Sequence, residues 1–146
     1  MSWVYKNKKV TSIPEGIFGF IYKLTLLKDT PLYPLGSIYI GKKQVNSVRK
    51  TKITKKEKIA TNNNRKRFKV VSKPMDWENY WSSSKEVATL IEQHGTDIFK
   101  REIIEFVPNK YLLTFKEIEH MILQKVHEVS SLNGTIGRFF ISKLKV

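Results

Sequence analysis

The sequence predicts a small α+β sandwich, an α/β arrangement in the broad sense, in which helices flank a three-stranded and mostly antiparallel sheet. Two β-rich segments, residues 17–26 and 37–41, are separated by a loop that contains two prolines and a closing glycine, as in a hairpin. A third β-rich segment covers residues 98–107, and helical patterns precede and follow it. This order of elements predicts a layered domain rather than a bundle or a barrel.

The chain divides into three parts. Residues 1–16 read as an N-terminal extension that ends in the turn-like Pro14-Glu15-Gly16. Residues 17–140 form the predicted domain, which includes a basic insert over residues 50–75, and residues 141–146 form a C-terminal tail. The insert shows little hydrophobic periodicity, so we expect an exposed segment, partly helical or mobile in the free protein.

Two helical patterns follow the insert. Trp77, Tyr80 and Trp81 have the i, i+3, i+4 spacing of one helix face, and core packing is favoured over base stacking as their role. The serines at positions 82–84 then offer an N-cap for a helix with an apolar stripe, and Gly95 ends it.

A long helix is predicted over residues 115–129, because Thr114 and Glu117 have the spacing of a capping box. Its apolar residues fall on one face: Phe115, Ile118, Ile122, Val126 and Val129. The same geometry puts Glu119 at the edge of this stripe and Glu117 nearly opposite. A carboxylate beside a buried face needs a metal, an arginine or a hydrogen-bonding network, so Glu119 is a candidate site residue.

Composition limits the class of protein. The 146 residues suit one domain, and the absence of cysteine excludes disulfides and thiolate metal sites. No apolar run reaches the length of about 18 residues that a membrane span needs, and the first residues lack a secretory signal. We expect a soluble protein that acts in the cytoplasm, without a membrane partner.

Positive charge is concentrated in one segment. The formal net charge is +14, and residues 42–73 hold thirteen Lys and Arg but one acidic residue. Such density favours binding to a polyanion over the alternative of a solvated loop. The residues expected to contact the polyanion, most simply a nucleic acid, are Lys43, Lys50, Lys52, Lys55, Lys56, Lys58, Arg65, Lys66, Arg67 and Lys69.

A set of short motifs carries the chemistry. Phe20-Ile21-Tyr22 and Tyr39-Ile40-Gly41 lie on the predicted hairpin, and downstream come Arg49, Glu119 and Asn133. In this order they resemble the catalytic set of the GIY-YIG nucleases. The segment from Tyr80 to Glu86 and the following helix are also similar to small phage-encoded homing-type nucleases, so the resemblance covers roughly residues 17–138.

The resemblance implies a role for each residue. Tyr22 or Tyr39 would accept a proton from the attacking water, with Lys42 as the cation that eases deprotonation. Arg49 would bind the scissile phosphate, and Glu119 would hold one Mg²⁺. Asn133 would support the site, and Gly41 would let the backbone approach the phosphate.

Several alternatives stay open. Arg65 or Arg67 fits the role of phosphate ligand as well as Arg49 does. The leading interpretation is a Mg²⁺-dependent, phage-encoded, homing-type DNA endonuclease, whose expected partner is double-stranded DNA. The main alternative is a non-catalytic nucleic-acid-binding protein on a degenerate domain of the same family. A basic RNA-binding protein is a third. The target sequence, nicking against double-strand cleavage, and a monomer against a dimer on DNA are undecided.

Overall fold

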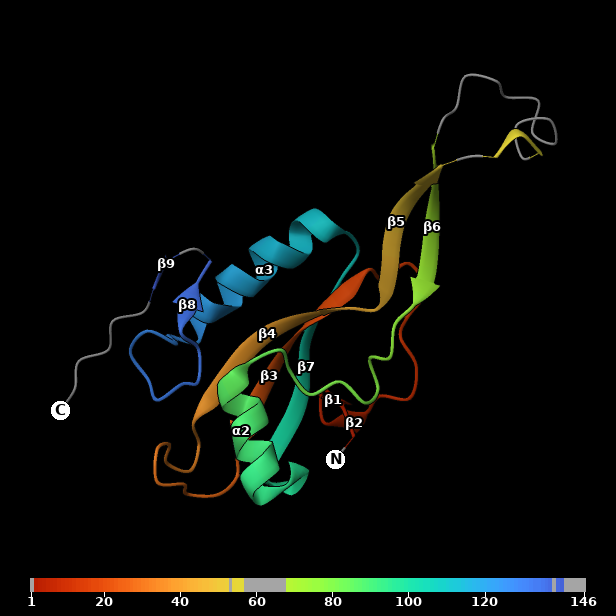
Figure 1. The fold of residues 1–146 in the computed structure, drawn as a ribbon. Helices are drawn as coiled ribbons and strands as arrows, with labels where there is room; N and C mark the ends of the chain where they lie inside the picture. Colours follow the sequence, from red (N-terminus) through yellow and green to blue (C-terminus); the bar gives the residue numbers. More distant parts are fainter. Residues whose placement is uncertain (1, 53, 57–67, 138, 141–146) are drawn as a thin grey trace.

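The computed structural model describes residues 2–52, 54–56, 68–137 and 139–140. Its elements follow one another as shown in Figure 1. In chain order they are β1 (Val4–Tyr5), β2 (Lys8–Lys9), β3 (Gly19–Leu26), β4 (Ile38–Gln44), β5 (Asn46–Lys52), β6 (Phe68–Pro74), α2 (Lys85–His94), the short 3-10 helix η1 (Thr96–Ile98), β7 (Phe99–Val107), α3 (Lys110–Leu123), β8 (Thr135–Ile136) and β9 (Phe139–Phe140).

The main sheet has five strands in the order β2-β1-β7-β3-β4. Its centre is the antiparallel set β7-β3-β4, so the predicted hairpin and third strand are present. The prediction of three strands is wrong, because β1 adds to β7 in parallel and β2 pairs with β1. The result is a mixed sheet with β4 at one edge.

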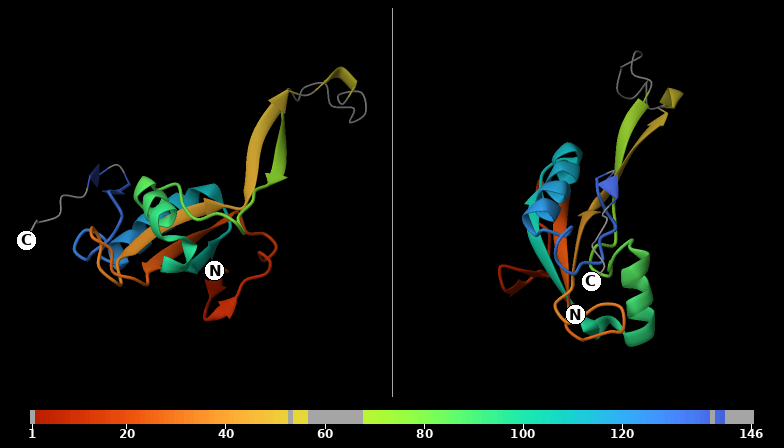
Figure 2. Two further views of the ribbon diagram at one scale, coloured as in Figure 1. Left: turned by 60° about the horizontal axis from the view of Figure 1, so that its bottom comes forward. Right: turned by 90° about the vertical axis from the view of Figure 1, so that its left-hand side faces the viewer.

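Helices cover the two faces of this sheet, and the view along the strands in Figure 2 shows α3 and α2 on opposite sides. Alternation along β3 sends its side chains to the two faces in turn. Phe20, Tyr22 and Leu24 join the core beneath α2, whereas Ile21 joins the core beneath α3. The α+β sandwich predicted from the sequence is therefore observed, and it has two separate cores.

The N-terminal residues belong to the core that contains Tyr22. Trp3 is buried, and its ring meets those of Phe20 and Tyr22 edge to face at 5.1 and 5.4 Å. Its indole Nε1 donates to the carbonyl of Trp77 at 2.9 Å. The segment predicted as an extension is thus packed against the sheet.

The basic insert begins and ends as a β-ribbon. Strands β5 and β6 pair antiparallel over seven residue pairs, from Asn46 opposite Pro74 to Lys52 opposite Phe68. Figure 1 shows this ribbon projecting away from the sheet and the helices. The expectation of partial helix is wrong for the paired residues, which form two strands joined by cross-strand hydrogen bonds. Mobility of the insert in the free protein stays a prediction.

The segment before α2 is irregular rather than helical. The spacing of Trp77, Tyr80 and Trp81 predicted a helix, yet all three are held against the α2-side core from a turn. The predicted core packing of these rings is confirmed. The helix that follows is capped as expected: the Ser84 side chain accepts from the Val87 N–H, and Gly95 ends the helix at a φ of 86°.

Helix α3 differs from its prediction in both its start and its buried face. Its N-cap is Asn109, whose side chain accepts from the Leu112 N–H at 2.9 Å, so the helix begins one turn before Thr114. Leu113 and Met121 are buried against the sheet. The predicted stripe is wrong at three of its five residues, since Phe115, Ile122 and Val129 are exposed, whereas Val126 is buried. The helix also ends at Leu123 rather than at residue 129.

No helix within the described part of the chain is long and apolar enough to cross a membrane.

Candidate active site

The two tyrosines of the sequence motifs lie next to each other on the sheet face that α2 covers. Tyr22 on β3 stands opposite Gly41 on β4, and Leu24 stands opposite Tyr39. The centroids of the two phenol rings are 6.1 Å apart. Tyr22 is 1% exposed and Tyr39 is half-buried, so Tyr39 is the one that an outside molecule can reach.

Burial makes both phenols weaker acids. Loss of solvent raises the pKa of Tyr22 well above its usual value, and the charges of Tyr39 and Tyr80 raise it further. Burial also raises the pKa of Tyr39, although a hydrogen bond from Ser82 works against that rise. The predicted helper, Lys42, is directed elsewhere: its Nζ donates to Thr114 Oγ1 at 3.1 Å on α3.

Position 41 must be glycine because the neighbouring tyrosine rings leave no space for a side chain there. An added Cβ at this position would lie 2.4 Å from the Tyr22 hydroxyl oxygen, 2.5 Å from its Cζ and 2.9 Å from Cε1 of Tyr39. Those distances are far below van der Waals contact, so the ring of Tyr22 lies directly over the glycine. The second motif therefore ends in glycine because the tyrosine of the first motif occupies the space of a side chain.

The outer edge of β4 is closed by the C-terminal segment. The Ile38 N–H donates to the Ser130 carbonyl at 3.2 Å, and the Leu132 N–H donates back to Ile38 at 2.8 Å. Farther along, Asn133 is buried and its amide pairs with Ile40: Oδ1 accepts from the main-chain N–H at 3.0 Å, and Nδ2 donates to the carbonyl at 2.9 Å. One side chain thus takes the place of a neighbouring strand.

We expect Asn133→Ala to lower the free energy of unfolding by about 1–3 kcal/mol, because it leaves a buried N–H and a buried carbonyl of Ile40 without their partner. Urea unfolding measures the loss. Gln93→Ala, which removes an exposed amide from α2, is the matched control and should change stability by less than about 0.5 kcal/mol. Equal effects of the two variants would contradict this role for Asn133.

Glu117 is the carboxylate at this edge. It follows Leu113 and precedes Met121 by four residues each, so it shares the sheet-facing side of α3. The main-chain N–H of Lys42 donates to its carboxylate, and burial raises its pKa while the charge of Lys42 lowers it. Its negative charge also adds to the raised pKa of Tyr39, which places the two groups in one electrostatic environment.

The sequence interpretation of Glu117 as a solvent-facing cap is therefore wrong. The N-cap of α3 is Asn109 rather than Thr114, and the Glu117 side chain faces β4, where it accepts from the Lys42 N–H.

Glu119 lies on another side of the same helix. Its side chain is 52% exposed, and Lys116 Nζ lies 3.1 Å from its Oε1 and 3.7 Å from Oε2 of Glu105 on β7. Glu105, Glu119 and His120 each place a ligand atom within 4.8 Å of one another, but the Lys116 ammonium already pairs with both carboxylates. Glu119 therefore lies near β7, and β3 separates β7 from β4 in the sheet.

The comparison of the chain with protein families fits this geometry. The family model described as "Putative endonuclease segE, GIY-YIG domain" matches residues 3–142. The chain belongs to the GIY-YIG endonuclease family. No curated protein and no solved structure gives a significant match.

A GIY-YIG domain that uses a divalent metal needs a hard oxygen ligand beside its tyrosines. Glu117 meets this requirement: it is one carboxylate, half-buried, with the Lys42 N–H on it and Tyr39 nearby. Mg²⁺ is commonly bound through one or two carboxylates and several waters, so this donor set fits the ion. The cluster around Glu119 fits it less well, because the Lys116 ammonium already pairs with both carboxylates and would repel a second cation there.

The cations predicted for this GIY-YIG domain fall into four groups. Lys43 is on the tyrosine face, with its Nζ 4.5 Å from the centre of the Tyr80 ring. Arg49 is on β5 opposite Val71, and the ribbon also carries Lys50, Lys52 and Lys69. Lys55 and Lys56 are exposed. Outside the described residues lie Lys58, Arg65, Lys66 and Arg67.

Sequence reasoning missed three residues of the site. Glu117 could have been found by taking Asn109 as the N-cap, since asparagine is among the best cap residues and Leu113 and Met121 then line up with Glu117. Tyr80 and Ser82 contact the tyrosine pair from an irregular segment, and no local pattern in the sequence indicates that contact.

Proposed function

We propose that this GIY-YIG domain is a divalent-metal-dependent DNA endonuclease that hydrolyses phosphodiester bonds at the outer edge of β4. The observation that supports the proposal is that three separate parts of the chain supply polar groups along β4. Tyr39 lies on this strand, Asn133 pairs with Ile40, and Glu117 accepts from the Lys42 N–H and acts on the pKa of Tyr39. A reachable phenol can act as a proton acceptor, and a carboxylate on a fixed backbone can hold a metal ion beside the phosphate. A homing role and a phage origin rest on the sequence resemblance alone.

The raised pKa of Tyr39 keeps its phenol protonated, so the proposed reaction begins with loss of that proton to solvent, which a cation held by Glu117 would favour. The oxygen of a water then attacks phosphorus, and the proton of that water passes to the Tyr39 phenolate. The bond from phosphorus to the 3′ oxygen breaks, and the leaving oxygen takes a proton from solvent. Glu117 would hold a Mg²⁺ ion, which when bound supplies positive charge to the phosphate and the leaving oxygen. Asn133 fixes the β4 edge, and Arg49 or an arginine of the insert would bind the phosphate.

Tyr39 is preferred over Tyr22 as the proton acceptor because Tyr22 is almost completely buried. We expect Tyr39→Phe to slow cleavage by about 100-fold, the effect typical of a lost general base. Tyr22→Phe removes only the hydroxyl that donates to Ser82, so a loss of about 10-fold is expected. Initial nicking rates of both variants measure this, and a larger loss for Tyr22→Phe would exchange the two roles.

The β5–β6 ribbon supplies the main contact with DNA in this proposal. Its two strands carry five cations and no acidic residue. A two-stranded β-ribbon has the width that the major groove of duplex DNA admits, and lysines on it would neutralise phosphates. Lys43 and the exposed Lys55 and Lys56 extend the positive charge from the site toward the ribbon and beyond it.

Neutralising the ribbon should weaken binding and flatten its salt dependence. The test variant carries four Lys→Gln changes, at Lys50, Lys52, Lys69 and Lys73. We expect the slope of log affinity against log salt to fall in magnitude by about 3 to 4, since each lost phosphate contact removes about 0.9. The control carries Lys→Gln at Lys6, Lys8, Lys9 and Lys110, which are exposed elsewhere. Equal slopes for the two variants would show that the ribbon is not the DNA contact.

A plasmid assay tests the function itself. Supercoiled DNA is incubated with the protein in Mg²⁺ or in EDTA, and conversion to nicked or linear DNA is followed. Metal-dependent conversion that Tyr39→Phe reduces is the expected result. Binding without cleavage on several DNAs would instead assign the chain to the alternative class, a nucleic-acid-binding protein on a degenerate domain. Nicked product before linear product is expected, because one site cuts one strand at a time.

A further inference from the structure

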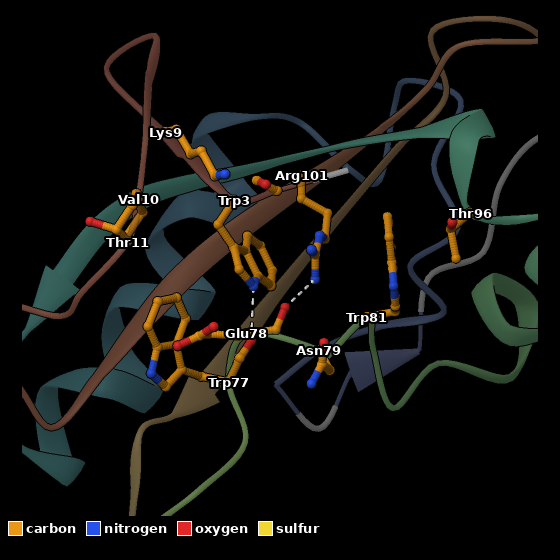
Figure 3. A pocket seen from close by; sticks show the side chains of 11 residues that line it. Trp3, Lys9, Val10, Thr11, Trp77, Glu78, Asn79, Trp81, Thr96 and Arg101 are labelled. Carbon is orange, nitrogen blue, oxygen red and sulfur yellow. Dashed lines mark hydrogen bonds between the residues drawn. The ribbon is translucent and has the colours of Figure 1, made fainter.

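Arg101 on β7 is a buried cation beneath the segment that precedes α2. It is 5% exposed, and its guanidinium lies between two indoles, with 4.6 Å to the ring centre of Trp3 and 4.1 Å to that of Trp81. Figure 3 shows this arrangement at the wall of a cavity of about 520 Å³. Burial lowers the pKa of Arg101 to about 10, so the group remains charged at neutral pH.

The guanidinium holds main-chain carbonyls of residues 77–82, which we call the covering segment. Arg101 Nη1 donates to the carbonyl of Glu78 at 3.1 Å and to that of Tyr80 at 2.7 Å. Trp3 Nε1 donates to a third carbonyl, that of Trp77, as the second dashed line in Figure 3 marks. The segment forms no helix, so these side chains fix positions that a regular hydrogen-bond ladder would otherwise fix.

The other side of the covering segment contacts the tyrosine pair. The Tyr80 ring meets the Tyr22 ring edge to face at 5.9 Å. The Tyr22 hydroxyl donates to Ser82 Oγ at 3.4 Å, and Ser82 Oγ is itself held by the Ser84 N–H at 2.9 Å. The segment therefore connects Arg101 to both phenols, through the carbonyl and the ring of Tyr80 and through Ser82.

We propose that Arg101 is a positioning residue of the reaction, which fixes the covering segment and thereby the place and the solvent exposure of the tyrosine pair. This inference rests on the proposed function. Arginine suits the role because its planar group stacks on two indoles while it donates to two carbonyls, which a lysine ammonium cannot do in one geometry. The cavity beside Arg101 leaves the covering segment room to shift once the guanidinium is lost.

Displacement of the covering segment should change the pKa values of Tyr22 and Tyr39. The ionisable groups that act on the phenols are Tyr80 from the segment and Glu117 from α3, together with each phenol on the other. Burial is the largest cause of the raised pKa of both tyrosines. A displaced segment admits water, so both pKa values should fall toward the ordinary value of a phenol while the geometry of the pair is lost.

The experiment compares Arg101→Lys with Lys100→Met, which removes an exposed cation from the adjacent position of β7. For Arg101→Lys we expect cleavage at saturating DNA to slow by about 100-fold, as for a small misplacement of reacting groups, with DNA affinity unchanged. Its pH–rate profile should move to lower pH. Lys100→Met should match the wild type. Wild-type cleavage rate and pH profile in Arg101→Lys would overturn the proposal.

A second measurement needs no nuclease activity. Tyrosinate absorbance is titrated in the free protein, with Tyr22→Phe used to identify the step of the buried phenol. Arg101→Lys should move that step to lower pH, whereas Lys100→Met should not. If the plasmid assay shows no cleavage but this shift occurs, the positioning role of Arg101 is supported and the proposed function is contradicted. If the Tyr22 phenol titrates at the same pH in a folded Arg101→Lys protein as in the wild type, the positioning role of Arg101 is overturned, whatever the plasmid assay gives.

Discussion

Glu117→Gln should reduce metal-dependent plasmid cleavage by about 1,000-fold, the loss expected when a preorganised electrostatic contribution to the transition state is removed. The carboxylate lies on the sheet-facing side of α3, accepts from the Lys42 N–H and acts on Tyr39. A glutamine keeps the volume and an oxygen that can accept from Lys42. The fold should therefore survive, and the loss should appear in the rate at saturating Mg²⁺ rather than in thermal stability.

Glu119→Gln is the matched control from the same helix. Its carboxylate is exposed and paired with Lys116, so cleavage should stay within about twofold of the wild type, as is usual for a surface pair. This comparison separates the two positions directly. If Glu119→Gln abolished cleavage and Glu117→Gln did not, the assignment made from the sequence would be right, and the metal would lie beside Glu105 and His120.

Gly41→Ala should have the second large effect, on stability and on cleavage together. The added methyl would overlap the Tyr22 hydroxyl oxygen, and that ring is buried, with 1% of its surface exposed. Overpacking of this kind costs about 1–3 kcal/mol. Relief requires Tyr22 to leave its place under Tyr80 and Ser82, so cleavage should fall beyond the loss that partial unfolding explains.

The control for this variant is Gly134→Ala. An added Cβ at Gly134 meets nothing within 4 Å, so its stability should change by less than about 0.5 kcal/mol. Urea unfolding and nicking rates are measured for both proteins. Wild-type stability of Gly41→Ala would mean that the Tyr22 ring does not occupy the space above the glycine.

The parts of the fold with local signals were predictable. Alternating β-rich residues gave the hairpin of β3 and β4, and with it the adjacency of Tyr22 and Tyr39. Ser84 and Gly95 marked both ends of α2, because a side-chain cap and a positive φ are properties of single residues. The resemblance of the motifs to a known family was not needed for these elements, since each is determined by its own residues.

Other features depend on contacts between distant residues. Strand β1 has two residues and pairs with β7, near Glu102, so no local pattern indicates it. The covering segment has helical spacing but is fixed by Trp3 and Arg101 from other strands. Helix α3 carries apolar residues on more than one face, and periodicity alone does not say which face meets a sheet.

The closed edge of β4 has a consequence for association between molecules. An edge strand with free N–H and carbonyl groups is a template for pairing with another chain and for aggregation. On β4 these groups are taken at Ile38 by the Ser130–Leu132 segment, at Ile40 by Asn133, and at Lys42 by Glu117. Asn133 and Glu117 thus occupy groups through which a second copy could add a strand at β4, and variants that open this edge should be more prone to form β-aggregates.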